Sequence, residues 1–340
     1  MSAESIAAQL LGPEGTVACQ AVAQGAHLAK WIHRQGAIGS VIKRDMSPVT
    51  VADFAVQALI ASRLSSAFPV LPIVAEEDAG DLVGELRDEV LALIRRFDPH
   101  TPVGPVAAWI ERGRCTSASQ FWTLDPIDGT REYLHDRQYV VALSLIEDGV
   151  VRLAVLGCPR LSFPYRMATT ADDFRGDGGI AVAVAGRGAW WIEPFAETMT
   201  RLSVSSTADL GHARIVHSYE RAHGCAADLD TFLRITGNTV ARYALDSQVK
   251  HAIVAAGRAD LLLRFPPDRS AREAIWDQAA GSLLIQEAGG RITDLDGRPL
   301  DFSTGRRLVR NNGVVASNGY LHDAALAALG MMRAEFRRAG

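Results

Sequence analysis

The stretch FWTLDPIDGT, residues 121–130, joins a short apolar run to two aspartates and a glycine. The run Phe121–Leu124 predicts a buried strand, and we expect Pro126 to stop the hydrogen-bond ladder because it has no N–H group. Asp125 and Asp128 then stand three residues apart at the end of a strand, where two carboxylates can converge on one point. The stretch therefore predicts an acidic site at a strand end.

Gly129 and Thr130 follow the second aspartate and are expected to open a helical turn. Free backbone N–H groups at such a turn form a cradle for phosphate. Magnesium prefers oxygen ligands and binds through a few carboxylates together with a substrate phosphate. With other acids nearby, this stretch has the composition of a site for a divalent cation and a phosphate.

Acidic residues also gather beside turns in three further segments. These are SPVTVAD (47–53), VAEED (74–78) and IWDQAAG (275–281). Each segment is open to a purely structural interpretation. Thr50 and Asp53 fit a capping box at a helix start, and residues 76–78 fit a solvated charge run. Asp277 fits the first turn of a helix, where the helix dipole favours a carboxylate.

Length and composition limit the class of protein. The chain has 340 residues, 48% hydrophobic and 22% charged, which is enough for two domains or one large α/β unit with a sizeable core. The formal net charge of −4 argues against a general nucleic-acid binder. A mildly acidic protein that handles an anionic substrate needs local positive charge or bound cations.

The cysteines and the N-terminal residues suggest a reducing, aqueous compartment. The four cysteines, Cys19, Cys115, Cys158 and Cys225, form no CxxC pair and are expected to be reduced thiols without a nucleophilic role. The first residues, MSAESIAAQLLGPEG, lack the basic and apolar regions of a signal peptide. No apolar stretch approaches the ~18–20 residues that cross a bilayer. We expect a soluble, cytoplasmic protein.

Periodicity predicts helices first and a strand meander after them. Helices are expected over residues 3–35 with a break at Gly12-Pro13, over 50–64 and over 82–96, followed by an irregular stretch at 98–120. Short apolar or alternating runs, separated by turn residues, predict strands at 121–124, 139–147, 151–157, 180–185, 189–192 and 201–204, typical of an antiparallel sheet.

Helices and strands alternate after about residue 205. Strands are expected at 214–217, 239–244, 261–265, 291–294 and 313–316, and helices at 225–234, 249–257, 275–287 and 321–333. The simplest division is two domains, residues 1–205 and 206–340.

The four acidic segments SPVTVAD, AEED, DPIDGT and WDQAAG occur in the order and approximate spacing of the inositol monophosphatase superfamily, which the chain resembles from about residue 5 to its end. WTLDPIDGT, QYVVALSLIEDG, LDSQVK and NNGVVASN are most similar to the 3′(2′),5′-bisphosphate nucleotidase branch. The resemblance implies a layered α/β/α/β/α sandwich (α+β to α/β) with an antiparallel N-terminal sheet and a smaller C-terminal α/β domain.

The resemblance also implies two to three magnesium ions. Their ligands would be Glu76, Asp125, Asp128, Asp277 and the backbone carbonyl of Ile127. Asp125 would bridge two cations, which together polarise a phosphoryl group and activate a water. Lithium is expected to inhibit by replacing one magnesium.

Asp53 and Thr130 resemble the catalytic pair of the family. A hydroxyl can relay a hydrogen bond from the attacking water to a carboxylate that accepts its proton. The attack would be direct and in line, without a phospho-enzyme.

Substrate residues also follow from the resemblance. The positions that match are Gly129 and Thr130 at the phosphate cradle and His223, Ser247, Lys250 and Arg264 in the second domain. Lys250 and Arg264 suit a second phosphate because each brings a positive charge and several N–H donors. The structural alternatives are a surface helix residue for Lys250 and a solvated loop residue for His223. Arg264 ends an apolar run, where a charge usually has a partner.

The reaction implied is hydrolysis of the 3′-phosphate of 3′-phosphoadenosine 5′-phosphate, giving AMP and phosphate, with its 5′-phosphosulfate analogue as a further substrate in sulfur metabolism. The alternatives are a phosphatase for inositol phosphates or nucleoside monophosphates, and a non-catalytic nucleotide and metal sensor. The expected partner is a small phosphorylated nucleotide, with no nucleic acid and no membrane, and a monomer is favoured. One departure stands beside the site: the chain has Arg131-Glu132-Tyr133 where eukaryotic members commonly have Lys-Gly-Phe.

Overall fold

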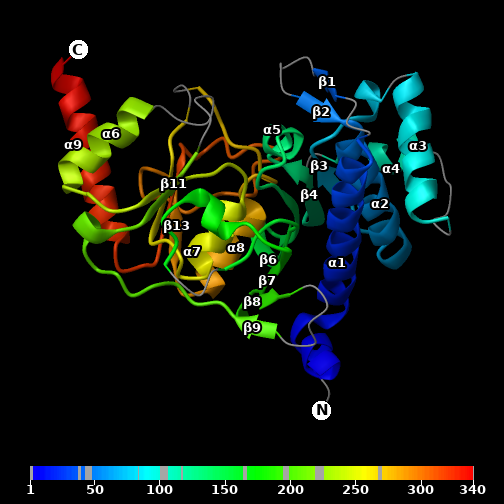
Figure 1. The fold of residues 1–340 in the computed structure, drawn as a ribbon, viewed down its shortest axis with the longest axis horizontal. Helices are drawn as coiled ribbons and strands as arrows, with labels where there is room; N and C mark the ends of the chain where they lie inside the picture. The colour runs from blue at the N-terminus through cyan, green and yellow to red at the C-terminus, as the bar shows by residue number, and fades with distance from the viewer. Residues whose placement is uncertain are drawn as a thin grey trace.

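The chain folds into alternating layers of helix and sheet (Figure 1). The computed structural model describes residues 3–36, 40–42, 48–82, 84–99, 106–115, 118–163, 167–193, 199–218, 226–266 and 270–339. Helices α1 (Ala3–Arg34) and α2 (Val51–Ala67) cover one face of the first sheet, and α7 (Val249–Ala255) and α8 (Ala279–Glu287) lie between the two sheets. Helices α6 (Ala226–Thr236) and α9 (His322–Ala339) pack on the outer face of the second sheet. This order confirms the α/β/α/β/α sandwich.

The first sheet has seven strands in chain order. They are β3 (Ile73–Ala75), β4 (Gln120–Asp128), β5 (Val140–Glu147), β6 (Val150–Cys158), β7 (Gly179–Val184), β8 (Gly188–Ile192) and β9 (Met199–Arg201). All neighbours pair antiparallel except β3, which pairs parallel to β4. The predicted antiparallel meander is confirmed, but its last strand ends at Arg201 rather than Val204. Strand β3 was not predicted.

The second sheet is smaller and mixed. Its strands, in the order β11-β10-β12-β14-β13, are β11 (Arg242–Ala244), β10 (Ile215–His217), β12 (Leu261–Arg264), β14 (Val314–Ser317) and β13 (Arg291–Thr293). Strand β10 pairs parallel with β11 and β12, and β14 pairs antiparallel with β12 and β13. One buried apolar cluster runs from the first sheet through α7 and α8 to the second. The split near residue 205 therefore stays a prediction.

Short elements complete the described fold. They are the hairpin β1 (Ser40–Ile42) and β2 (Pro48–Thr50), helices α3 (Glu85–Phe97), α4 (Val106–Glu111) and α5 (Thr130–Leu134), and 3-10 turns at Ala79–Asp81, Ala171–Phe174 and Leu210–His212. The prediction that 98–120 is irregular is wrong at α4, a six-residue helix that buries Val106 and Ile110. Among the helices of the described residues, none combines the length and the apolarity that crossing a membrane requires.

Two sequence signals shape the helices under the first sheet. Gly12 has a φ of 70°, so the helical run breaks there and Pro13 begins the second part, as predicted. Thr50 caps α2: its hydroxyl accepts from the N–H of Ala52 and Asp53, and the Asp53 carboxylate accepts from the N–H of Thr50. The predicted capping box is confirmed.

Strand β4 contradicts the prediction that Pro126 ends the ladder. The strand continues to Asp128, with a shift of register between Asp125, which pairs with Ala142, and Asp128, which pairs with Val140. A bulge needs no ladder hydrogen bond from the extra residue, so it tolerates proline. Residues three apart in a regular strand face opposite sides of a sheet, and the extra residue brings the two aspartates to the same side.

Candidate active site

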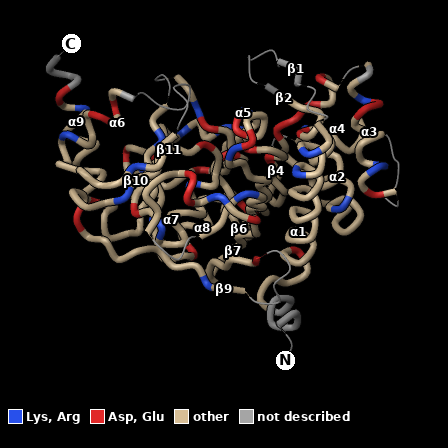
Figure 2. Tube along the Cα trace, in the orientation of Figure 1, with Lys and Arg blue, Asp and Glu red and all other residues tan. Residues whose placement is uncertain are grey.

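The acidic segments meet where β3 and β4 end. The N–H of Glu76, directly after β3, donates to the carbonyl of Leu124 at 3.1 Å, which fixes Glu76 beside Asp125. The Glu76 carboxylate is close enough to Asp125 to raise the pKa of that side chain. In Figure 2, acidic and basic positions lie together around β4 and α5, between the two groups of helices. The bulge and the parallel pairing thus gather carboxylates from segments about fifty residues apart in sequence.

Ionising the buried carboxylates of this cluster costs free energy when no cation is bound. The pKa of Asp125 is raised well above its usual range by burial and then by neighbouring carboxylates, Glu76 first. Burial also raises the pKa of Asp128, although the N–H of Gln248 donates to its Oδ2 at 2.6 Å and opposes the rise. Negative charges this close in a buried site favour a bound cation or a proton.

Asp277 brings the fourth segment into the same cluster. Burial raises its pKa well above the usual range, against the opposing charge of Arg264 at 3.7 Å. The prediction that Asp277 lies in the first turn of a helix is wrong, because α8 begins at Ala279 and Asp277 stands in the turn before it. The Asp277 carboxylate pairs with Arg264, and the charges of Asp128 and Glu76 also act on it, which places it beside the acidic cluster.

The residues present fit a divalent cation. Asp125 is 2% exposed, and its Oδ1 has no hydrogen-bond partner within the described ranges, which is what a carboxylate oxygen directed at a metal would show. No three histidine, cysteine, aspartate or glutamate side chains of the described residues form a ready-made metal cage. The fit therefore rests on the unpartnered Oδ1 of Asp125 and on the neighbouring carboxylates that raise the pKa of its buried side chain.

Asp53 and Thr130 meet as the sequence predicts. The hydroxyl of Thr130 lies 3.2 Å from Oδ1 of Asp53 and 3.2 Å from the carbonyl oxygen of Ile127. The other oxygen of Asp53, Oδ2, accepts from the backbone N–H and the hydroxyl of Thr50. The capping role and the contact with Thr130 therefore use different oxygens of one fully buried carboxylate.

Gly129 forms the junction with the second half of the chain. It adopts φ 96°, and a Cβ there would stand 3.2 Å from the Cβ of Ser247. Ser247 itself has φ 67°, and its hydroxyl accepts from the N–H of Val249 at 3.3 Å. Glycine adopts this φ without strain, whereas Ser247 is a non-glycine residue in the left-handed region, next to Gln248, whose N–H contacts Asp128 of β4.

Lys250 is buried and Arg264 is largely buried near the acidic cluster. Lys250 is 1% exposed, so its interpretation as a surface helix residue is wrong. Its ammonium donates to the carbonyl of Leu245 at 3.0 Å and to the hydroxyl of Ser218 at 3.3 Å. Arg264 pairs with Glu273 at 2.8 Å, which confirms that this charge has a partner, and its Nε has none among the residues described. His223 lies outside the described residues.

Two glutamines that were not predicted hold the segments of the site together. Gln248 donates to the carbonyl of Trp276 at 2.9 Å and accepts from the N–H of Gly281 at 3.0 Å. Gln57 makes a pair of hydrogen bonds with the backbone of Glu77 at 2.8 and 3.0 Å. A signal for Gln57 was present in the sequence, since it is a polar residue on a helix whose surroundings are apolar.

The two buried cysteines, Cys19 and Cys158, have the properties of core residues. Burial raises the pKa of the Cys19 thiol to about 12 and that of Cys158 further still. Cys115 is half-buried and Cys225 lies outside the described residues. A thiol with a raised pKa is a poor nucleophile, in agreement with the sequence prediction.

Comparison with known proteins identifies the family. Residues 14–331 match the model of the inositol monophosphatase family. The chain is 37% identical over 321 residues to 3′(2′),5′-bisphosphate nucleotidase 1 of Candida albicans, covering 87% of each chain. It is 33% identical over 330 residues to the 3′(2′),5′-bisphosphate nucleotidase of Schizosaccharomyces pombe, covering 89% of this chain and 91% of the relative.

The solved structure of IMPase TM1415 from Thermotoga maritima superposes with a TM-score of 0.63 at 21% identity, covering 93% of this chain and 96% of that one. At this identity the likeness supports the fold alone. The family match spans nearly the whole chain and includes all four acidic segments. The chain therefore belongs to the inositol monophosphatase family.

Proposed function

We propose that the chain is a magnesium-dependent phosphatase that hydrolyses the 3′-phosphate of 3′-phosphoadenosine 5′-phosphate to AMP and phosphate. Members of the family generally depend on magnesium. The observation that carries the proposal is the meeting of Asp53 and Thr130, at 3.2 Å, beside the buried Asp125 and the partly buried Asp128 of β4. Relatives at 33–37% identity that are named 3′(2′),5′-bisphosphate nucleotidases support the substrate.

Two to three magnesium ions would be held by Glu76, Asp125, Asp128, Asp277 and the carbonyl of Ile127, and would supply Lewis-acid polarisation of the phosphoryl group and of the attacking water. The fit rests on the unpartnered Oδ1 of Asp125 and on the raised pKa of its buried carboxyl.

The chain's own residues would handle the proton. The Thr130 hydroxyl accepts a hydrogen bond from the attacking water and donates its own proton towards Oδ1 of Asp53. As the water oxygen bonds to phosphorus, the bond from phosphorus to the 3′-oxygen breaks. The Thr130 hydroxyl passes its proton to the Asp53 carboxylate and takes one from the water, and the departing 3′-oxygen takes up a proton from solvent to become the 3′-hydroxyl of AMP. Thr50 holds Oδ2 of Asp53 throughout, so the accepting oxygen keeps its orientation.

The 5′-phosphate is proposed to bind near Ser247, Arg264 and Lys250, with His223 from the adjoining segment. Arg264 retains a buried Nε donor that the protein leaves unpaired within the described residues, which suits a phosphate oxygen. The Lys250 ammonium has three N–H donors, of which the carbonyl of Leu245 and the hydroxyl of Ser218 accept from two, so the third could serve a phosphate oxygen.

A substrate panel tests the proposal. Phosphate release is measured with magnesium and then with EDTA from 3′-phosphoadenosine 5′-phosphate, its phosphosulfate, AMP, and inositol mono- and bisphosphates. Magnesium-dependent release from the bisphosphorylated nucleotides alone supports the proposal. Preference for an inositol phosphate or for AMP would overturn the substrate, and nucleotide binding without release from any member would favour a sensor.

A further inference from the structure

Arg306 reaches across the molecule from the loop between β13 and β14. Its guanidinium donates to the carbonyl of Ala75 at 2.7 Å and to the carbonyl of Gly113 at 3.1 Å. Ala75 is the last residue of β3, and Gly113 lies beside it, because the N–H of Ala75 donates to the same carbonyl of Gly113 at 2.9 Å. One side chain of the second half of the chain therefore fixes the end of β3.

The same guanidinium also covers an aromatic ring. It stands 4.6 Å from the ring centre of Trp276, which is 7% exposed and whose carbonyl accepts from Gln248. A guanidinium at this distance over an indole makes a cation–π contact. The backbone reinforces the arrangement, because the N–H of Ile275 donates to the carbonyl of Arg306 at 3.1 Å.

The residues that Arg306 touches precede two acidic residues of the site. Ala75 is followed by Glu76, and Trp276 is followed by Asp277. Glu76 comes from the first sheet and Asp277 from the turn before α8, so no single element sets the distance between the two carboxylates. Arg306 contacts Ala75 and Trp276, the residues directly before these two carboxylates, at the same time.

We propose that Arg306 is a positioning residue for the metal site, holding Glu76 and Asp277 at the separation that magnesium requires. The inference rests on the metal site proposed above. Arginine suits the position because its planar fork donates to two carbonyls while its face lies against the ring. Lysine can supply the charge but not this combination of contacts.

The test compares Arg306→Gln and Arg306→Lys with the parent protein, using Arg307→Gln as a matched control. Arg307 is the exposed neighbour, and its side chain donates to the carbonyl of Arg272 at 3.0 Å. Manganese binding is titrated by electron paramagnetic resonance without substrate. The magnesium concentration for half-maximal phosphate release is measured separately, and far-ultraviolet circular dichroism monitors the fold.

We expect Arg306→Gln to weaken manganese binding and to raise the magnesium requirement, each by about tenfold, the lower end of the range for residues that orient metal ligands. Arg306→Lys should lose less, and Arg307→Gln should match the parent. Parental values for both metal readouts in folded Arg306→Gln would overturn the role, and so would an equal loss in Arg307→Gln. If Arg306→Gln does not fold, Arg306→Lys decides by the same criteria. A parent that binds no manganese would instead overturn the metal site itself.

Discussion

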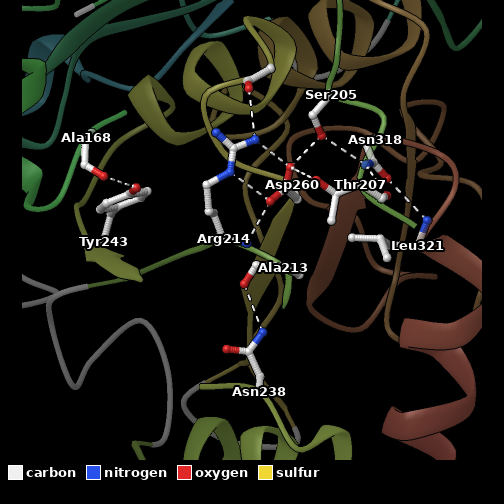
Figure 3. A network of polar contacts seen from close by, with 11 residues as sticks. Ala168, Ser205, Thr207, Ala213, Arg214, Asn238, Tyr243, Asp260, Asn318 and Leu321 are labelled. Carbon is white, nitrogen blue, oxygen red and sulfur yellow. Dashed lines mark hydrogen bonds and ion pairs between the residues drawn. The ribbon is translucent and has the colours of Figure 1, made fainter. Parts of the chain in front are cut away.

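Replacing Asp260 tests how the segment after the first sheet is attached to the second. Figure 3 shows Asp260 between Arg214 on one side and Ser205 and Thr207 on the other, with Asn318 beside them. The carboxylate is fully buried and accepts five hydrogen bonds, three from Arg214 and one each from the two hydroxyls. Asn318 donates to Ser205 and to the carbonyl of Thr207, which extends the network.

The magnitude follows from what the substitution leaves behind. Asp260→Ala removes the partner of a guanidinium whose side chain is 15% exposed, and removing one member of a buried ion pair costs about 3–5 kcal/mol. The control is Asp230→Ala, since Asp230 is 74% exposed and lies 3.8 Å from Arg242, and an exposed pair contributes about 0–1 kcal/mol. Urea unfolding followed by tryptophan fluorescence measures both. A loss below about 1 kcal/mol for Asp260→Ala would refute the reasoning, since it would fall in the range of exposed pairs.

The pH dependence gives the same prediction a second readout. Burial alone would raise the pKa of Asp260, but the hydrogen bonds from Arg214 and Ser205 outweigh it and lower the pKa below its usual value. A carboxyl with a depressed folded pKa stabilises the fold above its unfolded pKa of about 3.9, and the stabilisation is lost as pH falls through the folded value. The difference between parent and Asp260→Ala should therefore be constant from neutral pH to about pH 5 and shrink below about pH 4. A difference that instead shrinks as pH rises would contradict this assignment.

Three further outcomes concern the active site. Asp53→Asn should lower kcat by about 10²–10⁴-fold while manganese binding survives, and near-normal turnover would leave Asp53 with its capping role alone. Gly129→Ala should lower the free energy of unfolding by about 1–2 kcal/mol and should also lower kcat/KM, because a side chain at φ 96° is strained and its Cβ would crowd Ser247. An unchanged free energy of unfolding would contradict this. Millimolar lithium should slow phosphate release in the presence of magnesium, and unchanged rates would count against lithium replacing one of the ions.

The sequence predicted the elements whose signals are local. The capping residues and apolar face of α2 lie within one helix, and the alternating runs of β5 to β8 are separated by turn residues, so each could be recognised without the rest of the chain. Strand β3 escaped because it has three residues and pairs parallel to a strand distant in sequence, which leaves neither a hairpin turn nor a long alternation. Pro126 was misread because its position in a bulge depends on the register with β5.

The acidic residues of the site could be predicted, but not what holds them. Asp125 and Asp128 stand in one motif, whereas the contact between Gln248 and Asp128 joins positions 120 residues apart and that between Arg306 and Ala75 joins positions 231 apart. Such contacts arise only when the two sheets and the helices between them pack together in the folded chain. No pattern of spacing in a single sequence encodes them.

The charges of the site offer an explanation of how a mildly acidic chain would bind the proposed substrate, which carries two phosphates. Lys250 and Arg264 both lower the pKa of Asp128, against the larger effect of its burial, so they already act on the acidic cluster. Arg264 also pairs with Glu273 and stands 3.7 Å from Asp277. The same cations can therefore balance the carboxylates and attract an anionic substrate. Because Arg264 by itself would contact both the carboxylates and the second phosphate, the binding of magnesium and of that phosphate should be coupled. A substrate without the second phosphate should therefore require more magnesium for half-maximal phosphate release. Identical magnesium dependence for 3′-phosphoadenosine 5′-phosphate and for a 3′-monophosphate would show that Arg264 acts on the carboxylates alone.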